Sequence, residues 1–363
     1  MRFNGAVIPD RSYARAGVDT GRSGLAVAGL VGVLSGIDPG RPSRSVVGSG
    51  HYASVLALDD RIGLALATDG VGTKTIVAEA LGRFDTVGID CVAMNANDLV
   101  CVGAEPIALL DYIAVEEVDP ERLTAIAEGL AAGAEAAGIE IPGGELAQLP
   151  ELVRGHPSPY GFDLVGTCAG IVALDRLVTG ADVEPGDAVI GIPSTGVHAN
   201  GLTLARRLLP ALDEAPIELG GRTVGEELLV PTAIYVRAVL ALLAAPGLEV
   251  HGLAHITGDG LLNLLRLHSE VGYRIDAPLA RPGIFDLIAR RGEATPAELY
   301  EVFNMGCGFC CVVPSGQAAA AVKLVEELHP GTAVVGSVTE AAGVVELPGV
   351  GLVGDRAGGF SSA

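Results

Sequence analysis

The residues of this chain that are best suited to chemistry lie in residues 68–74, with the sequence Thr-Asp-Gly-Val-Gly-Thr-Lys. The carboxylate of Asp69 can bind a divalent cation through hard oxygen ligands. Glycine at positions 70 and 72 allows the backbone to approach a ligand closely. Lys74 is one of only two lysines in the chain, and its ammonium can reach a phosphate. The segment therefore predicts an anion site.

Two familiar nucleotide-binding loops do not match the chain. The P-loop requires a lysine directly after glycine, whereas Thr73 separates Gly72 from Lys74. Residues 48–53 resemble the glycine turn of a dinucleotide fold, and Asp69 lies near the expected downstream acid. However, residues 55–67 have the pattern of a hairpin and not of a helix. A Rossmann site is therefore not favoured.

Composition limits the classes of partner. The chain has 363 residues, of which 49% are hydrophobic, and this length is typical of about two domains. The net charge of −21 argues against a surface that binds nucleic acid or anionic membrane. A bound phosphate must therefore be held locally, by Mg²⁺, Lys74, an arginine such as Arg83, or a helix N-terminus. Both a salt-rich habitat and a GC-rich genome are compatible with the acidity.

The six cysteines lie among apolar residues, which predicts buried, reduced thiols. Cys307 and Cys310 have C-x-x-C spacing, but no second Cys/His pair follows, so a metal or redox site is not favoured. Residues 24–34 form an apolar run that is too short to span a bilayer and has no convincing cleavage site after it. We expect a helix packed on the body there, in a cytoplasmic protein.

The pattern of elements predicts two domains, residues 1–174 and 175–363, divided at the polar segment 175–187. Asp119 and Pro120 are expected to start a long helix that stops at Gly138. We expect Asn200 to cap another helix. The remaining predicted elements are a hairpin ending at Asp69, helices at 75–81, 92–102 and 261–267, a loop at 143–145, an exposed excursion at 148–160, and strands at 162–174, 188–192 and 307–313.

Ten motifs in register resemble the aminoimidazole ribonucleotide synthetase family, also called the phosphoribosylformylglycinamidine cyclo-ligases. The resemblance covers nearly the whole chain. The motifs lie at residues 13–19, 68–74, 88–94, 97–99, 103–106, 110–112, 143–145, 196–201, 231–236 and 254–258, with Phe303-Asn304 after them.

The resemblance implies an N-terminal α/β domain that closes a β-barrel with a second subunit of a homodimer, followed by an α+β C-terminal domain. It also implies that Mg²⁺ and ATP bind between the domains. The reaction would phosphorylate the formyl oxygen of formylglycinamidine ribonucleotide. The amidine nitrogen would then close the imidazole ring as phosphate leaves. Such phosphoryl transfer depends mainly on positioning and charge neutralisation.

The resemblance also implies residue roles, for which alternatives remain. Helix capping is the alternative for the acids, and a structural role is the alternative for His198. His255 stands where related ATP-using members have an acid, so metal, nucleotide or core contacts are all open. The expected metal ligands are Asp69, Asp98 and His255; the catalytic residues are Lys74 and His198; the ATP site is Asp69, Gly70, Gly72, Thr73, Lys74, Asn97 and Asp98; and the substrate site is Gly50, His51, Glu145, Asn200, Thr257 and Gly258.

Three positions depart from the family pattern. Leu146 and Gln148 stand where members often have threonine and glutamate, and Asp259 stands where they have glycine. These changes affect loop details and substrate affinity more than the implied activity. Selenophosphate synthetase would need a reactive Cys or selenocysteine near His51, and thiamine monophosphate kinase or the hydrogenase-maturation relative would lack the combined 196–201 and Phe303-Asn304 motifs. A non-catalytic nucleotide-binding paralogue is a further alternative.

Overall fold

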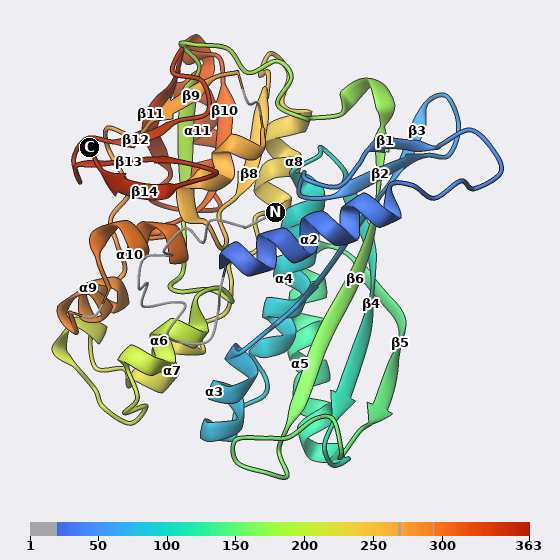
Figure 1. Cartoon of the computed structure of the whole chain (residues 1–363), viewed down its shortest axis with the longest axis vertical. Coiled ribbons are helices and arrows are strands. Elements are labelled where there is room, and N and C mark those ends of the chain that lie inside the picture. The colour runs from blue at the N-terminus through green and yellow to red at the C-terminus, as the bar shows by residue number, and fades with distance from the viewer. Residues whose placement is uncertain (1–19, 268–269, 293) are drawn as a thin grey trace, which may run out of the picture.

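The computed structural model describes residues 20–267, 270–292 and 294–363, so the motif at residues 13–19 lies outside the described residues. The fold is mixed α/β and is built on two sheets with helices packed against them (Figure 1). No helix in the described ranges is long and apolar enough to cross a membrane.

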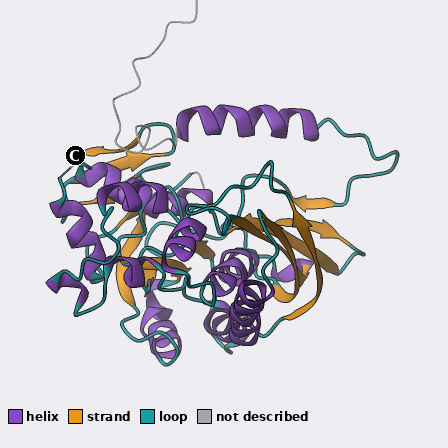
Figure 2. Ribbon diagram, turned by 90° about the horizontal axis from the view of Figure 1, so that it is seen from below, coloured by secondary structure: helices purple, strands orange, loops and turns teal. Residues whose placement is uncertain are grey.

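The first sheet has six strands in the order β1-β2-β3-β6-β4-β5 and curls like half of a barrel (Figure 2). Neighbouring strands are antiparallel except β4 and β5, which are parallel. The strand bounds are β1 Ser45–Val47, β2 Ser54–Ala57, β3 Ile62–Gly70, β4 Glu105–Val115, β5 Glu140–Gln148 and β6 Phe162–Ala173.

The two faces of this sheet differ. Burial along β6 alternates with period two, as expected for a strand with one covered face. Leu109 and Leu164 are fully buried on the face that α4 (Val87–Val100) covers. Strand register puts Leu110, Tyr112 and Ile171 on the other face, where they are exposed. One apolar face of the sheet is thus open in the single chain.

Helix α5 (Pro120–Ala137) lies against α4 and holds it on the sheet. The predicted cap is confirmed, because Asp119 accepts hydrogen bonds from the backbone N–H groups of Glu121 and Arg122. The C-cap Gly138 has a φ of 73°, as expected for a glycine stop. Where the two helices cross, a Cβ on Gly88 would overlap the backbone of Gly129 and Leu130, so only glycine permits this close approach.

The second sheet has eight strands in the order β14-β13-β12-β9-β11-β7-β10-β8. Its strands are β7 Ala188–Pro193, β8 Gly252–His255, β9 Gly272–Arg274, β10 Cys307–Val313, β11 Ala333–Thr339, β12 Val345–Leu347, β13 Leu352–Asp355 and β14 Gly359–Ser362. The helices of this half are α6 Leu202–Leu208, α7 Val224–Leu228, α8 Val236–Ala244, α9 Gly283–Arg290, α10 Pro296–Val302 and α11 Ala318–Glu326. Helix α3 (Lys74–Leu81) belongs to the first half. Short 3-10 helices occupy η1 Leu174–Arg176, η2 Ile217–Leu219, η3 Gly260–Arg266 and η4 Ser315–Gln317.

Several local expectations were wrong. Helix α2 (Thr20–Leu34) is not packed on the body: Leu25 is 77% and Val33 75% exposed, and the helix stands apart in Figure 2. Residues 143–145 belong to strand β5 and form no loop, because backbone pairing with β4 orders them. Helix α4 begins at Val87, five residues before the expected start.

Candidate active site

Helix α4 carries the residues on which the site is built. Asp90, Met94, Asn97 and Cys101 follow one another at intervals of three or four, and Asp98 comes four residues after Met94, so all five share one side of the helix. Asp90, Met94, Asn97 and Asp98 contact the segments that come from the second half of the chain, at Thr232, Asn200, Ala233 and His255 respectively. The helix is therefore the junction between the two halves.

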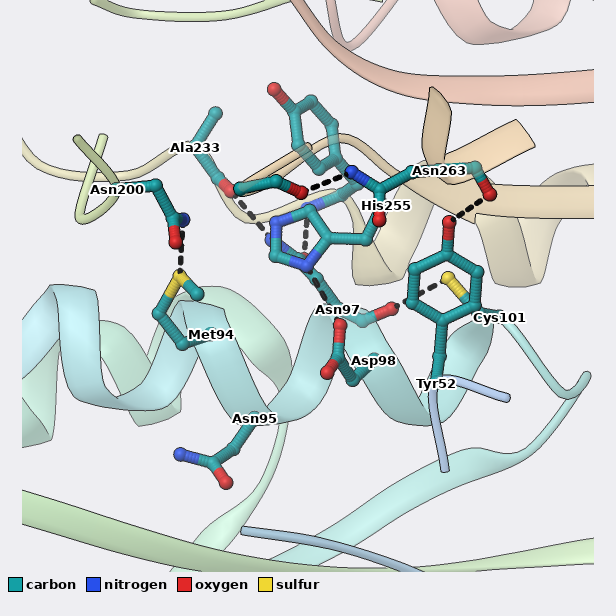
Figure 3. Close-up of polar contacts among 12 residues, drawn as sticks. Tyr52, Met94, Asn95, Asn97, Asp98, Cys101, Asn200, Ala233, His255 and Asn263 are labelled. Atoms are coloured by element: carbon teal, nitrogen blue, oxygen red, sulfur yellow. Dashed lines mark hydrogen bonds and ion pairs between the residues drawn. The ribbon is translucent and has the colours of Figure 1, made fainter. Parts of the chain in front are cut away.

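Asn97 fixes the distance between the helix and the second half. Its amide donates to the carbonyl of Ala233 at 2.9 Å and accepts from the N–H of Tyr235 at 2.9 Å. Next to it, Asp98 Oδ1 lies 2.8 Å from Nδ1 of His255, at the end of β8 (Figure 3). His255 is fully buried, whereas the side chain of Asp98 is 19% exposed. The exposed part of Asp98 is available to a ligand.

Asp69 lies near the end of β3 and close to Asp98. Burial raises the pKa of Asp69, and the negative charge of Asp98 raises it further. The N–H of Gly70 donates to Asp69 Oδ1 at 2.7 Å, and Asn95 donates to the carbonyl of Asp69. The helix-capping alternative is wrong for both acids, since the N-cap residues of α3 and α4 are Thr73 and Thr86.

The chemistry of these groups fits Mg²⁺. Two neighbouring carboxylates supply hard oxygen ligands, and Mg²⁺ commonly completes its shell with substrate phosphates and water. His255 already uses Nδ1 to hold Asp98, so its geometry favours orienting this carboxylate over binding the metal. No group of three or more His, Cys, Asp or Glu side chains among the described residues is arranged to hold a metal by itself.

Lys74 differs from the expectation. Its side chain is fully buried, and its ammonium lies 2.8 Å from Asp90 Oδ2 and donates to the carbonyl of Val230 at 2.7 Å. Burial lowers the pKa of Lys74, and the charge of Asp90 opposes this. In this arrangement the ammonium is bound to groups inside the protein and is not exposed to solvent. Sequence reasoning missed Asp90, whose signal was an acid within an otherwise apolar helix segment.

The other residues of the glycine-rich loop remain placed for a ligand. Gly70 ends β3, and Gly72 is exposed with a φ of 67° and with no atom within 4 Å of where a Cβ would stand. Thr73 contacts the hydroxyl of Thr203 on α6 at 3.0 Å. A phosphate could therefore approach this backbone closely.

His198 is buried and held by the backbone. Its φ is 64°, in the left-handed region, and its Nε2 accepts the N–H of Thr195 at 3.1 Å. Its Nδ1 is buried without a hydrogen-bond partner. Burial lowers the pKa of His198 well below the usual value, and the neighbouring His255 and Lys74 lower it further. The imidazole is therefore neutral at physiological pH.

Some expected substrate residues come together, and one does not. Asn200 does not cap α6, whose N-cap is Gly201; its amide instead contacts the sulfur of Met94 at 3.8 Å, close to Gly258. Thr257 precedes Gly258 in the same loop. Glu145 pairs with Tyr112 on the open face of the first sheet, whereas Asp98 lies on the covered side. Glu145 is thus apart from the acids within one chain.

Asp259, which departs from the family pattern, stands at a position whose backbone conformation favours glycine. It is exposed and has a φ of 72°, a conformation that glycine adopts more readily than aspartate. The following residue, Gly260, could not carry a Cβ without overlapping the carbonyl of Tyr300. Residues 260–266 form the 3-10 helix η3 and not the expected α-helix.

His51 and Gly50 lie in the loop before β2, with the ring of His51 packed against the ring of Tyr52.

Comparison with known proteins agrees with this arrangement. The family model of the AIR synthase related protein N-terminal domain matches residues 50–172, and that of the C-terminal domain matches residues 184–347. The chain belongs to the AIR synthase related protein family.

Relatives with an assigned activity are similar along almost their whole length. The chain is 47% identical to a phosphoribosylformylglycinamidine cyclo-ligase from Thermococcus gammatolerans, over 94% of this chain and 99% of the relative. It is 45% identical to the protein of that name from Methanothermobacter thermautotrophicus, over 93% of this chain and 96% of the relative.

Solved structures share the fold at lower identity. A thiamine-monophosphate kinase from Stenotrophomonas maltophilia has a TM-score of 0.60 at 22% identity, covering 84% of this chain and 92% of that one. The hydrogenase maturation protein HypE in complex with ATP has a TM-score of 0.59 at 21% identity, covering 85% and 86%.

The buried ion pair yields a stability prediction. Lys74→Met leaves the Asp90 carboxylate buried without its counter-charge and should lower the free energy of unfolding by about 3–5 kcal/mol. Arg83→Gln is the control, because the Arg83–Asp85 pair is about half exposed and should contribute less than about 1 kcal/mol. Urea unfolding measures both. Equal, small losses in the two variants would contradict a structural role for Lys74.

Proposed function

We propose that this chain closes the imidazole ring of formylglycinamidine ribonucleotide to form aminoimidazole ribonucleotide, with ATP converted to ADP and phosphate. It is then a ligase that forms a carbon–nitrogen bond in purine biosynthesis. The observation that carries the proposal is the 47% identity to a cyclo-ligase over 94% of the chain. The proximity of Asp69 and Asp98 at the junction of the halves supports it.

The reaction divides into two steps. The formyl oxygen attacks the γ-phosphorus of ATP, and the bond from that phosphorus to the ADP oxygen breaks. The amidine nitrogen then attacks the activated carbon, and the carbon–oxygen bond breaks as phosphate leaves with the former formyl oxygen. A proton is lost from the ring nitrogen. A bound Mg²⁺ would neutralise phosphate charge, and Asp69 and Asp98 are the residues to hold it.

The remaining residues take positioning roles in this proposal. The backbone of the 70–73 loop faces the phosphates of ATP, and His255 orients Asp98. Asn200, Thr257 and Gly258 contact the ribonucleotide from the second half. We assign residues 1–174 to the ATP-binding and dimer-forming domain and 175–363 to the second domain, which the family matches at 50–172 and 184–347 support. The cytoplasmic location remains a prediction.

Substrate-dependent ADP release tests the activity and the role of Asp98. The wild-type chain should release ADP only when formylglycinamidine ribonucleotide is present. Asp98→Asn should bind Mg·ATP at least about tenfold more weakly and lose measurable turnover, because it removes a charged metal ligand. Asp175→Asn, an exposed acid on the linker, is the control. ATP binding without substrate-dependent ADP release by the wild type would favour the non-catalytic paralogue.

We also propose that His198 serves ring closure and not ATP binding. As a neutral imidazole with a free, buried Nδ1, it can exchange a proton once the substrate is bound. His198→Ala should lower the substrate-dependent rate by about a hundredfold while Mg·ATP affinity stays near that of wild type. His156→Ala, at an exposed histidine, is the control. An unchanged rate at both limiting and saturating substrate would leave only a structural role.

A homodimer is the third proposal. On the open face of the first sheet, Leu110 is 51% exposed, Ile171 41% and Tyr112 39%. A contiguous apolar face of this kind is typical of a protein–protein interface. A second copy of the half-barrel has the matching shape and the same apolar character. This pairing would also bring Glu145 to a subunit interface, since Glu145 pairs with Tyr112 on that face.

Sedimentation tests the dimer. The wild type should sediment at twice the 36.7 kDa chain mass. Leu110→Glu should shift it toward a monomer, because a charge would be buried without a partner at the interface. Ile217→Glu is the control, since Ile217 is 91% exposed and lies on η2, outside the sheet. An active wild-type monomer at micromolar concentration would contradict the proposal.

A further inference from the structure

We propose that Arg266, with His51 beside it and Tyr52 beneath it, forms a subsite for a phosphate monoester. The proposal deepens the function above and rests on it for the identity of the molecule that carries the phosphate. It assigns a ligand-binding role to Arg266, the last residue of η3. Its ligand chemistry, a doubly charged oxyanion, is common to both substrates of the proposed reaction.

Arg266 is a partly buried cation without an anion. Its guanidinium lies over the ring of Tyr52, with the central carbon 5.1 Å from the ring centroid. No carboxylate within the described ranges forms an ion pair with it, although the chain has 44 acids and 23 basic residues. By contrast, Arg222 and Arg290 each pair with a glutamate. A partly buried guanidinium for which the described residues provide no hydrogen-bond or ion-pair partner is suited to bind an oxyanion.

Tyr52 holds this cation in place and ties it to the substrate loop. Its hydroxyl is buried and donates to the carbonyl of Asn263 at 3.0 Å. The side chain of Asn263 in turn donates to the carbonyls of Gly258 at 2.6 Å and Gly260 at 2.8 Å. The aromatic ring is therefore a fixed support under Arg266, connected through Asn263 to the loop expected to contact the ribonucleotide.

His51 supplies a second, independent observation. Both of its ring nitrogens are buried and have no hydrogen-bond partner. Burial lowers the pKa of His51; the backbone of Thr179 is near enough to oppose this, without a hydrogen bond of normal geometry. Buried polar atoms are nearly always satisfied, so these nitrogens indicate a missing partner. A neutral imidazole can donate one N–H to a phosphate oxygen.

Charge and location connect the subsite to the acids. The charges of both Arg266 and Asp98 act on His51 and on Tyr52, which places all four groups in one region. Asp69 and Asp98 repel a phosphate that arrives without a metal ion. A cation over the ring of Tyr52 gives a phosphate monoester a separate place to bind, near the carboxylates but not on them.

Calorimetric titration with inorganic phosphate tests the subsite without reference to the reaction. Arg266→Gln should weaken phosphate binding at least about tenfold, the scale of a lost charge-assisted hydrogen bond, and Arg266→Lys should recover part of it. Arg356→Gln makes the same charge change at an exposed position and should bind like wild type. Thermal unfolding confirms that each variant is folded. Equal affinity in the wild type and a folded Arg266→Gln overturns the subsite.

Steady-state kinetics then identify the source of the phosphate. A rise of tenfold or more in KM for formylglycinamidine ribonucleotide, with KM for ATP unchanged, assigns the ribonucleotide phosphate. The converse assigns a phosphate of ATP. Unchanged KM values together with unchanged phosphate affinity reject the inference while the wild-type activity stands. Absence of wild-type activity would reject the proposed function, and the phosphate titration would still decide the subsite.

Discussion

The buried ion pair between Lys74 and Asp90 is the interaction on which the rest of the site depends. It joins the start of α3 to the first turn of α4, and Asp90 also accepts hydrogen bonds from the N–H and hydroxyl of Thr232. Lys74 adds a hydrogen bond to the carbonyl of Val230. The ammonium of Lys74 and the carboxylate of Asp90 are both buried away from water. They depend on these hydrogen bonds and on each other, because a buried charge without its counter-charge is strongly destabilising. The pair therefore fixes where residues 230–232 lie against α4.

The position of α4 determines the position of Asp98. With its first turn held at Asp90 and its last turn held by Asn97, the helix presents Asp98 to His255 and brings it close to Asp69 on β3. Glycine at position 88 brings α5 close behind it. The two acids that we propose as metal ligands thus come from one helix and one strand of the core. Such support is what phosphoryl transfer needs, since its catalysis relies on position and charge.

Local signals in the sequence predicted much of the fold. The cap at Asp119, the stop at Gly138 and the strand expected at residues 162–174 follow from neighbours in the chain, and all three are confirmed, the strand ending at Ala173. The interpretation of Lys74 differed from the structure because its partner, Asp90, comes from another helix. The prediction that Asn200 caps a helix was wrong because its amide contacts Met94 on α4. Arg266 and Tyr52 were missed because they meet only after folding.

Transfer of the formyl oxygen tests the central claim most directly. Formylglycinamidine ribonucleotide labelled with ¹⁸O at the formyl group should be converted in ordinary water with Mg·ATP, and the released phosphate should be analysed by mass spectrometry. If this chain activates that oxygen by phosphorylation, each phosphate released with the imidazole product carries one ¹⁸O atom. Phosphate without the label, formed at the same rate as the imidazole product, would contradict the account, because ATP would then be hydrolysed by water apart from ring closure.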